Sequence, residues 1–153
     1  MEDIRRIIAE HPFLTGAPEI VADLLARSSR KVVIPAGAII AREGEPAEKF
    51  YLLLRGKASI EAKLPSNEEI NVQVVGPGHA LSWSWLLPPY QWHFTAKALE
   101  EIEALEWDTK ELRQLAEENP QFGYEMARRM TGVLLERLRA THEQVTEYFE
   151  VGD

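Results

Sequence analysis

Most side chains that could do chemistry in this chain lie in one segment, between Gly78 and Leu99. The segment holds three of the four tryptophans, two of the four histidines and two closely spaced serines, Ser82 and Ser84. A serine becomes a nucleophile beside a histidine and an acid, and no such pattern accompanies these two. Serine is also common near the start of a helix. The residue types therefore predict a binding site without catalytic residues.

The four histidines do not have the spacing of a metal site. They include no close pair, and no carboxylate lies near His93 in the sequence. Cysteine is absent, which excludes disulfides, thiolate metal sites and cysteine nucleophiles. We expect no bound metal, and we expect His93 to be a half-buried strand residue.

The charge balance argues against direct nucleic-acid binding. The net charge is −8, from 17 Lys and Arg against 25 Asp and Glu, whereas DNA affinity comes from clustered basic side chains that displace counterions. One basic cluster occurs near the C-terminus, and glutamates interleave with it, as is typical of a solvated helix face. The residues are Arg128, Arg129, Arg137 and Arg139, with Glu125, Glu136 and Glu143.

No segment has the character of an export signal or a membrane span. The first 13 residues are charged and amphipathic, unlike a signal peptide. The longest apolar run, residues 80–89, is too short to cross a bilayer. We therefore expect a cytoplasmic protein with no membrane contact.

The chain begins with helical periodicity and then changes to short strands. Apolar spacing predicts a helix over residues 2–10, and Pro18 can open a second one. From Lys31 onward, short β-rich runs alternate with glycine and proline at the roughly 8–12-residue spacing of a sandwich or barrel. The predicted strands cover residues 32–34, 38–41, 50–54, 58–62, 70–75 and 94–98, with a hairpin tip at 65–67.

Two helices are predicted after the strands. Asp108 is a good N-cap for a helix that ends before Asn119-Pro120. The last helix runs from about Gln121 to Phe149, a length of about 40 Å. Because a small β-domain cannot cover that length, we expect part of its apolar stripe to meet a second copy of the chain.

An ordered set of glycines and apolar residues indicates a family. The run from Gly37 to Gly56 resembles the pattern G-x-x-I-x-x-x-G-x-x-A-x-x-F-Y-x-L-x-x-G of the cyclic nucleotide-binding superfamily, the catabolite activator or Crp/Fnr-like proteins. The stretch from His11 to Arg30 is similar to that family's N-terminal helices. The resemblance implies one domain, a mainly β fold with flanking helices: N-terminal helices at 1–29, a double-stranded β-helix (a jelly-roll-like β-roll) at 30–107, and C-terminal helices at 108–153.

In that family the ligand sits in a cassette, here residues 78–95, that resembles F-G-E-L-A-L-L-x-x-x-P-R-x-A. The resemblance implies that backbone amides and the Arg contact the phosphate while the Glu accepts from the ribose. Ser82 stands at the Glu, and either Gln91 or Trp92 stands at the Arg. Under both registers the Glu/Arg pair is missing, and Lys97 is the only fixed charge between Gly78 and Leu99.

The missing Arg predicts phosphate binding weaker by roughly 10- to 100-fold. We therefore expect a cyclic nucleotide (cAMP or cGMP) to bind weakly, or another small planar ligand to replace it. The segment is also similar to a tryptophan-rich cassette of stand-alone bacterial members, G-W-S-W-L-F-P-P-Y-R-W-H-F. The candidate ligand-binding residues are Ser82, Trp83, Ser84, Tyr90, Gln91, Trp92, His93 and, on the last helix, Thr141.

Two interpretations of the tryptophans stay open. They can line a pocket for a planar ligand, or they can fill the space of the nucleotide. Thr141 lies where family members reach the base, and it is also compatible with a heptad-face residue that binds nothing.

Three function classes follow from these features. The first is a regulatory sensor module that signals through a homodimer or a protein partner, because no helix-turn-helix segment follows the last helix. The second is an interaction module with a filled pocket and no ligand. The third, a cupin-like enzyme, requires a His-x-His with a further acid and histidine, and the sequence has no such set.

Overall fold

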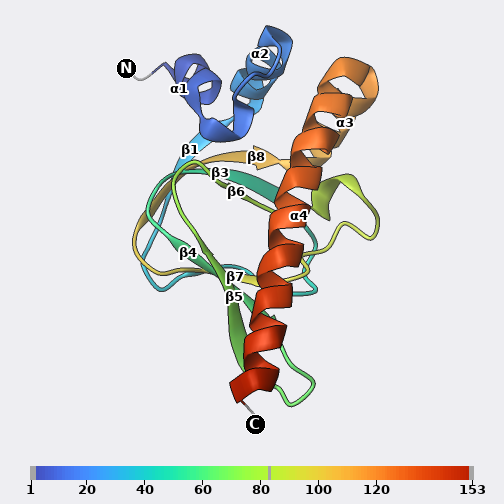
Figure 1. Cartoon of the computed structure of the whole chain (residues 1–153). Helices are drawn as coiled ribbons and strands as arrows, with labels where there is room; N and C mark the ends of the chain where they lie inside the picture. Colours follow the sequence, from blue (N-terminus) through green and yellow to red (C-terminus); the bar gives the residue numbers. More distant parts are fainter. Residues whose placement is uncertain (1–2, 83, 152–153) are drawn as a thin grey trace.

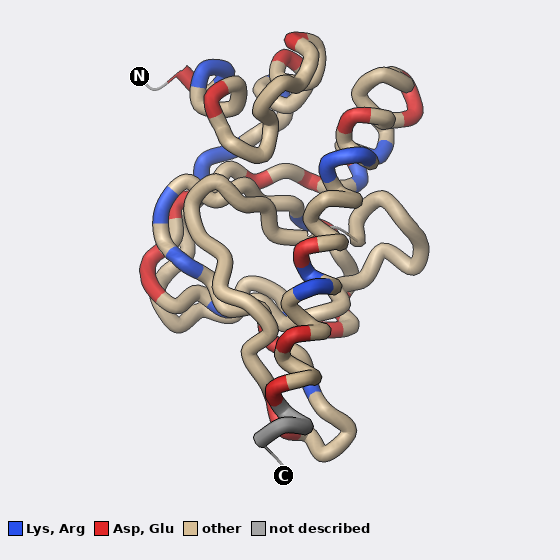
Figure 2. Tube along the Cα trace, in the orientation of Figure 1, with Lys and Arg blue, Asp and Glu red and all other residues tan. Residues whose placement is uncertain are grey.

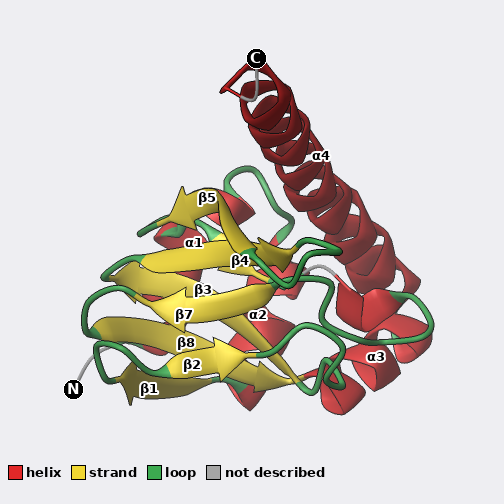
Figure 3. Cartoon of the chain, turned by 90° about the horizontal axis from the view of Figure 1, so that it is seen from below, coloured by secondary structure: helices red, strands yellow, loops and turns green. Residues whose placement is uncertain are grey.

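The computed structural model describes residues 3–82 and 84–151, with side chains described up to residue 147. Two four-stranded antiparallel sheets form the body of the molecule (Figures 1 and 3). The first sheet has the order β1-β8-β3-β6 and the second β2-β7-β4-β5. The strands are β1 Arg30–Ile34, β2 Ile39–Ala41, β3 Lys49–Arg55, β4 Ala58–Lys63, β5 Glu69–Val75, β6 Ala80–Leu81, β7 Thr95–Ala98 and β8 Ile102–Asp108.

The chain crosses repeatedly between the two sheets, which makes them one rolled unit. β7 pairs with β2 and β4, and the next strand, β8, pairs with β1 and β3 of the other sheet. Apolar side chains of both sheets form the core, which contains Leu52, Ile60, Ala96 and Leu105. This architecture confirms the predicted β-roll with flanking helices.

The N-terminal helices lie against one end of the roll (Figure 1). α1 spans Ile4–Glu10, a 3₁₀ turn η1 spans Pro12–Leu14, and α2 spans Glu19–Ser28 with Pro18 at its N-cap. α2 buries Val21, Leu24 and Leu25. The indole Nε1 of Trp107 on β8 donates to the Leu25 carbonyl at 2.8 Å, which ties α2 to the first sheet.

Two helices follow the roll. α3 spans Thr109–Glu118, and the Asp108 carboxylate accepts from the Lys110 and Glu111 amides as the predicted N-cap. α4 spans Pro120–Val151, 32 residues, so it is about 48 Å long. An added Cβ at Gly123 would lie 2.9 Å from the Ala116 carbonyl oxygen, so the two helices pack closely at their junction. The far end of α4 projects beyond the roll (Figure 3).

Phe50 on β3 is the centre of an aromatic cluster. Its ring is fully buried and lies 5.9 Å from the Phe13 ring, 5.6 Å from Trp85 and 5.6 Å from Trp107. Phe13 lies in η1, Trp85 in the segment before β7, and Trp107 in β8. Such large buried rings contribute strongly to a core. Elements distant in sequence therefore share one set of contacts.

α4 is also fastened to the N-terminal turn. Arg129 donates to the carbonyl oxygens of Phe13 and Thr15 at 2.8 and 3.0 Å. Its guanidinium also lies 3.5 Å from the Glu125 carboxylate. None of the helices in the described part of the chain is long and apolar enough to cross a membrane.

Gly56 is required by a close backbone approach, which a matched pair of variants can test. Gly56 and Gly44 both have a positive φ, +86° and +89°. A Cβ on Gly56 would lie 2.2 Å from the Glu101 carbonyl oxygen, whereas a Cβ on Gly44 would meet nothing within 4 Å. Gly44→Ala should cost about 1–2 kcal/mol from φ alone, and Gly56→Ala at least about 3 kcal/mol because the backbone must shift. Urea unfolding measures both, and equal losses would contradict the packing argument.

His11 links η1 to β3 through both ring nitrogens. Nε2 lies 2.9 Å from the Leu53 carbonyl oxygen, and Nδ1 accepts from the Phe13 amide at 3.2 Å. The neutral ring with its proton on Nε2 satisfies both contacts, and a protonated Nδ1 would lose the second. Burial lowers the pKa of His11 from its usual 6.5; the Leu53 carbonyl opposes this shift, and His79 adds to it.

A lowered pKa gives a stability that depends on pH. The unfolded chain binds a proton at His11 near pH 6.5, and the folded chain binds it only at lower pH. Stability should therefore be complete above about pH 6.5 and fall as the pH drops below it. Chemical unfolding of the wild type and His11→Asn at pH 7.5 and 5.5, values chosen about 1 unit to either side of that pKa, measures the effect. His11→Asn should lose part of the pH dependence of the unfolding free energy, and the same dependence in both proteins would refute the assignment.

Candidate ligand-binding site

The segment between β5 and β7 runs along the side of the roll next to α3 and α4 (Figure 1). After β6, residues Ser84–Leu86 form a single 3₁₀ turn, η2. Residues 90–92 then pair with residues 44–47: the Ala47 amide donates to the Tyr90 carbonyl at 2.6 Å, and the Trp92 amide donates to the Glu45 carbonyl at 2.8 Å. Both ends of the segment are therefore held by the roll.

Ser82 lies at the point where the segment leaves β6. Its side chain is buried, and its Oγ has no hydrogen-bond partner among the described residues. Its φ is +82°, in the left-handed region that favours glycine. The tryptophan-rich cassette carries glycine at this position, so the backbone conformation agrees with that resemblance. Ser84, also buried, begins η2.

Trp85 is a core residue. It is fully buried, its ring packs on Phe50, and Arg113 of α3 donates to its carbonyl oxygen at 3.0 Å. Trp83, one of the predicted ligand-binding residues, lies outside the described residues. Trp85 therefore fixes the segment to the core and is not available to a ligand.

The three residues that follow the loop point in different directions. Tyr90 lies under the Arg113 guanidinium, 4.3 Å from its ring centroid, and Gln91 is exposed. Trp92 is buried and lines the pocket beside the segment. Of the two candidates for the family's Arg position, the structure directs Trp92, not Gln91, toward the pocket.

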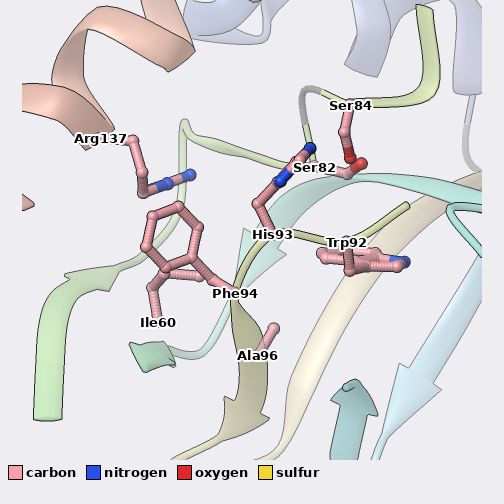
Figure 4. A pocket seen from close by; sticks show the side chains of 8 residues that line it. All are labelled: Ile60, Ser82, Ser84, Trp92, His93, Phe94, Ala96 and Arg137. Atoms are coloured by element: carbon pink, nitrogen blue, oxygen red, sulfur yellow. The ribbon is translucent and has the colours of Figure 1, made fainter. Parts of the chain in front are cut away.

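A narrow pocket brings four of the eight predicted ligand residues together (Figure 4). Its empty volume is about 270 Å³, part of it open to solvent, and about one water-sized sphere fits between its walls. Pockets for small molecules usually measure roughly 300–1,000 Å³, so the enclosed space between these walls is far smaller than a usual ligand site. The lining residues are Ile60, Ser82, Ser84, Trp92, His93, Phe94, Ala96 and Arg137.

His93 differs from the sequence-based expectation. It was predicted to be a half-buried strand residue, but it is exposed and lies in a bend before β7 begins at Thr95. The strand alternation starts with Thr95, so Ala96 and Ala98 point inward. The physical reason is that residues 90–92 pair with the 44–47 segment, and the chain must turn before it joins β4.

Arg137 of α4 is the pocket residue that the sequence analysis missed. The basic cluster on this helix was predicted to be a solvated face, yet Arg137 is only 3% exposed. Its Nη1 donates to the Gln73 Oε1 on β5, and among the described side chains no carboxylate lies within ion-pair distance. The sequence does carry a signal, because Met126, Met130, Val133 and position 137 recur at the spacing of one buried helical stripe.

The pocket takes its only fixed positive charge from outside the cassette. Figure 2 shows that the segment between β6 and β7 carries no Lys, Arg, Asp or Glu. Among the described lining residues, Arg137 alone has a permanent charge. Burial lowers the pKa of Arg137, an effect that attraction to Glu136 opposes.

Thr141 lies one turn after Arg137 and does not line the pocket. Its hydroxyl donates to the Arg137 carbonyl oxygen at 2.7 Å, so it is bonded to its own helix. Within the described ranges, no group of three His, Cys, Asp or Glu side chains could hold a metal ion. The donor set that a cupin-like enzyme needs is thus absent from the described part of the chain.

Comparison with known proteins agrees with this geometry. Residues 31–119 match the family model described as the cyclic nucleotide-binding domain. A CRP-like cAMP-activated global transcriptional regulator of Mycobacterium tuberculosis is 24% identical over 141 residues, which cover 92% of this chain and 61% of that protein. The chain thus spans less than two thirds of the length of this curated relative.

Solved structures share the fold. A putative cyclic nucleotide-binding protein of Geobacter metallireducens superposes with a TM-score of 0.77 at 22% identity, covering 90% of this chain and 99% of that one. The c-di-GMP responsive global regulator of Xanthomonas campestris gives 0.71 at 18% identity, covering 84% and 63%. With more than half of its length inside the family model, the chain belongs to the cyclic nucleotide-binding domain family.

Proposed function

We propose that the chain is a cytoplasmic, non-enzymatic regulatory module that binds a small molecule in the pocket between its cassette and α4. The observation that carries the proposal is the shared lining of that pocket. Ser82 and Ser84 come from the cassette, and Arg137 comes from the helix. A ligand there would contact both the cassette and α4. Ligand binding could therefore change the position of the helix, as a sensor requires.

The cassette supports weak, rather than tight, binding of a cyclic nucleotide. It has neither the Glu nor the Arg of the family pattern, and its helix is one 3₁₀ turn of three residues. Two relatives respond to different nucleotides by name, one to cAMP and one to c-di-GMP. The fold therefore accommodates more than one ligand, and cAMP, cGMP and c-di-GMP are all reasonable probes.

The filled-pocket alternative has a specific observation in its favour. Trp85 occupies the core, Trp92 is buried, and the remaining space is smaller than a usual ligand site. Under this alternative the chain is a protein-interaction module without a ligand. The alternative leaves the buried Arg137 and the unpartnered Ser82 hydroxyl without a role.

We further propose that α4 joins two copies of the chain. A second stripe of the helix faces away from the roll and recurs at spacings of four and three residues. This is the a/d repeat of a two-stranded coiled coil, and a second copy of the same helix supplies the matching repeat about a two-fold axis. The stripe consists of Thr131, Leu135, Leu138, His142 and Val145.

Signalling by such a dimer would pass to a protein partner rather than directly to DNA. The net charge of −8 opposes contact with a phosphate backbone. In the described part of the chain, Arg129 and Arg137 of the basic cluster are turned inward to protein contacts. Over the described residues, the basic side chains therefore do not gather into the patch that nucleic-acid binding requires.

Ligand binding can be tested by thermal unfolding with cAMP, cGMP and c-di-GMP. A ligand at 100 times its Kd adds about 2.7 kcal/mol of stability, so even weak binding gives a measurable rise in Tm. We expect a rise at millimolar and not at micromolar concentration, because the charged pair of the cassette is missing. A rise at micromolar cAMP would contradict the weak cassette. No rise with any of the three would favour the filled pocket.

The dimer can be tested by one exposed leucine on the outward stripe. Leu138 is 63% exposed, and Leu99, in the turn after β7, is a control at 52%. Leu138→Glu should place a charge in the apolar seam and give monomers, whereas Leu99→Glu should leave the assembly unchanged. Sedimentation velocity at micromolar concentration distinguishes the two states. A wild type that sediments as a monomer would refute the dimer.

A further inference from the structure

Arg137 is a buried cation that the described protein does not neutralise. A guanidinium offers five N–H donors and no acceptor, and that of Arg137 donates one hydrogen bond to the neutral side-chain amide of Gln73. A charge removed from water is unfavourable unless an opposite charge or several hydrogen bonds replace the lost hydration. The lowered pKa of Arg137 has the same cause, burial. A guanidinium nevertheless keeps its proton at neutral pH, so the charge stays in the pocket wall.

A second unsatisfied polar group lies on the cassette side of the same pocket. The Ser82 hydroxyl is buried without a hydrogen-bond partner among the described residues, and it can donate to an anion. Figure 4 shows Arg137 reaching into the pocket from α4, with Ser82 and Ser84 on the opposite, cassette side. Buried hydroxyls without a partner and buried cations without a counter-ion are both uncommon in native proteins, so one of each around a single space calls for a shared explanation.

Apart from Ser84 and His93, the rest of the pocket wall is apolar. Ile60 and Ala96 are buried, and Phe94 and Trp92 add aromatic surface to the wall. Aromatic walls favour a planar or apolar group. With one permanent charge in the lining, a ligand that carries one negative charge leaves no net charge in the pocket, whereas a dianion would leave one.

We propose that Arg137 of α4, together with the Ser82 hydroxyl, binds the anionic group of the ligand in place of the cassette Arg. The ligand is then a small monoanion with a planar or apolar part, a chemistry shared by cyclic phosphodiesters and aromatic carboxylates. The inference rests on the proposed function of this pocket and adds which residue contacts the charged group of the ligand. Charge-assisted contacts of this kind are the strong ones in a binding site.

The ligand-free protein provides the first test. If the charge of Arg137 is uncompensated until an anion binds, Arg137→Met removes an unfavourable buried charge and should leave the Tm of the ligand-free protein unchanged or raise it. Arg139→Met, two residues away on the exposed face of the same helix, is the matched control. If Arg137→Met fails to fold or melts far below both the wild type and the control, Arg137 has a structural role and the proposal is overturned.

Ligand titration provides the second test. The probes are cAMP as a phosphodiester, benzoate as a carboxylate and adenosine as a neutral control, with the half-maximal concentration of the Tm rise as the readout. Arg137→Met should raise that concentration roughly 10- to 100-fold for the anion that binds. Ser82→Ala, which removes only the hydroxyl, should raise it less, and Arg137→Lys should restore part of the loss. Arg139→Met should match the wild type.

The outcomes separate this inference from the proposed function. Equal titrations for the wild type and Arg137→Met would leave ligand binding intact and overturn the role of Arg137. Adenosine binding as tightly as cAMP would likewise show that the negative charge of the ligand does not contribute to its affinity. A wild type that responds to no probe, benzoate included, would overturn both the ligand pocket and its anion contact.

Discussion

The packing of three rings around Phe50 is the constraint on which the rest of the structure depends. It joins the N-terminal turn through Phe13, the cassette through Trp85 and the last strand of the roll through Trp107. The cassette is therefore positioned by core packing and not by the charged contacts of the family pattern. Trp85 is anchored in the core, and its carbonyl accepts from Arg113. Ser82, which follows β6 directly, has a positive φ that serine rarely adopts.

α4 contacts the elements that carry the Phe50 cluster and also presents an exposed face. Arg129 holds the η1 turn that carries Phe13, and Gly123 lets α4 pack closely on α3, which in turn holds the cassette through Arg113. Successive residues of a helix lie about 100° apart, so Arg137 and Leu138 face the pocket and the outward stripe, respectively. A rigid helix with these contacts cannot shift at one face without moving the other. The arrangement thus offers a short path from the pocket to the proposed dimer seam.

The sequence predicted most of the fold because its signals are local. The glycine order from Gly37 to Gly56, the Asp108 cap and the alternation that buries Ala96 and Ala98 each follow from nearby residues, and the structure contains all three features. The site was less predictable. Arg137 was assigned to a solvated face because interleaved glutamates are typical of one, and only the three-dimensional position of β5 shows what covers it. His93 was assigned to a strand that begins two residues later, since the pairing of residues 90–92 with 44–47 is a long-range contact.

The position of the positive charge has a thermodynamic consequence. A ligand shifts an equilibrium between two states only by the difference in its interaction with each. A cassette Arg would contact an anion whether or not α4 is docked on the roll, and such a contact favours neither state. A charge on α4 makes the contact only when the helix lies against the pocket. In the proposed arrangement, the free energy of the charge-assisted contact would go into docking the helix, and weak overall affinity would be compatible with strong coupling between ligand and helix.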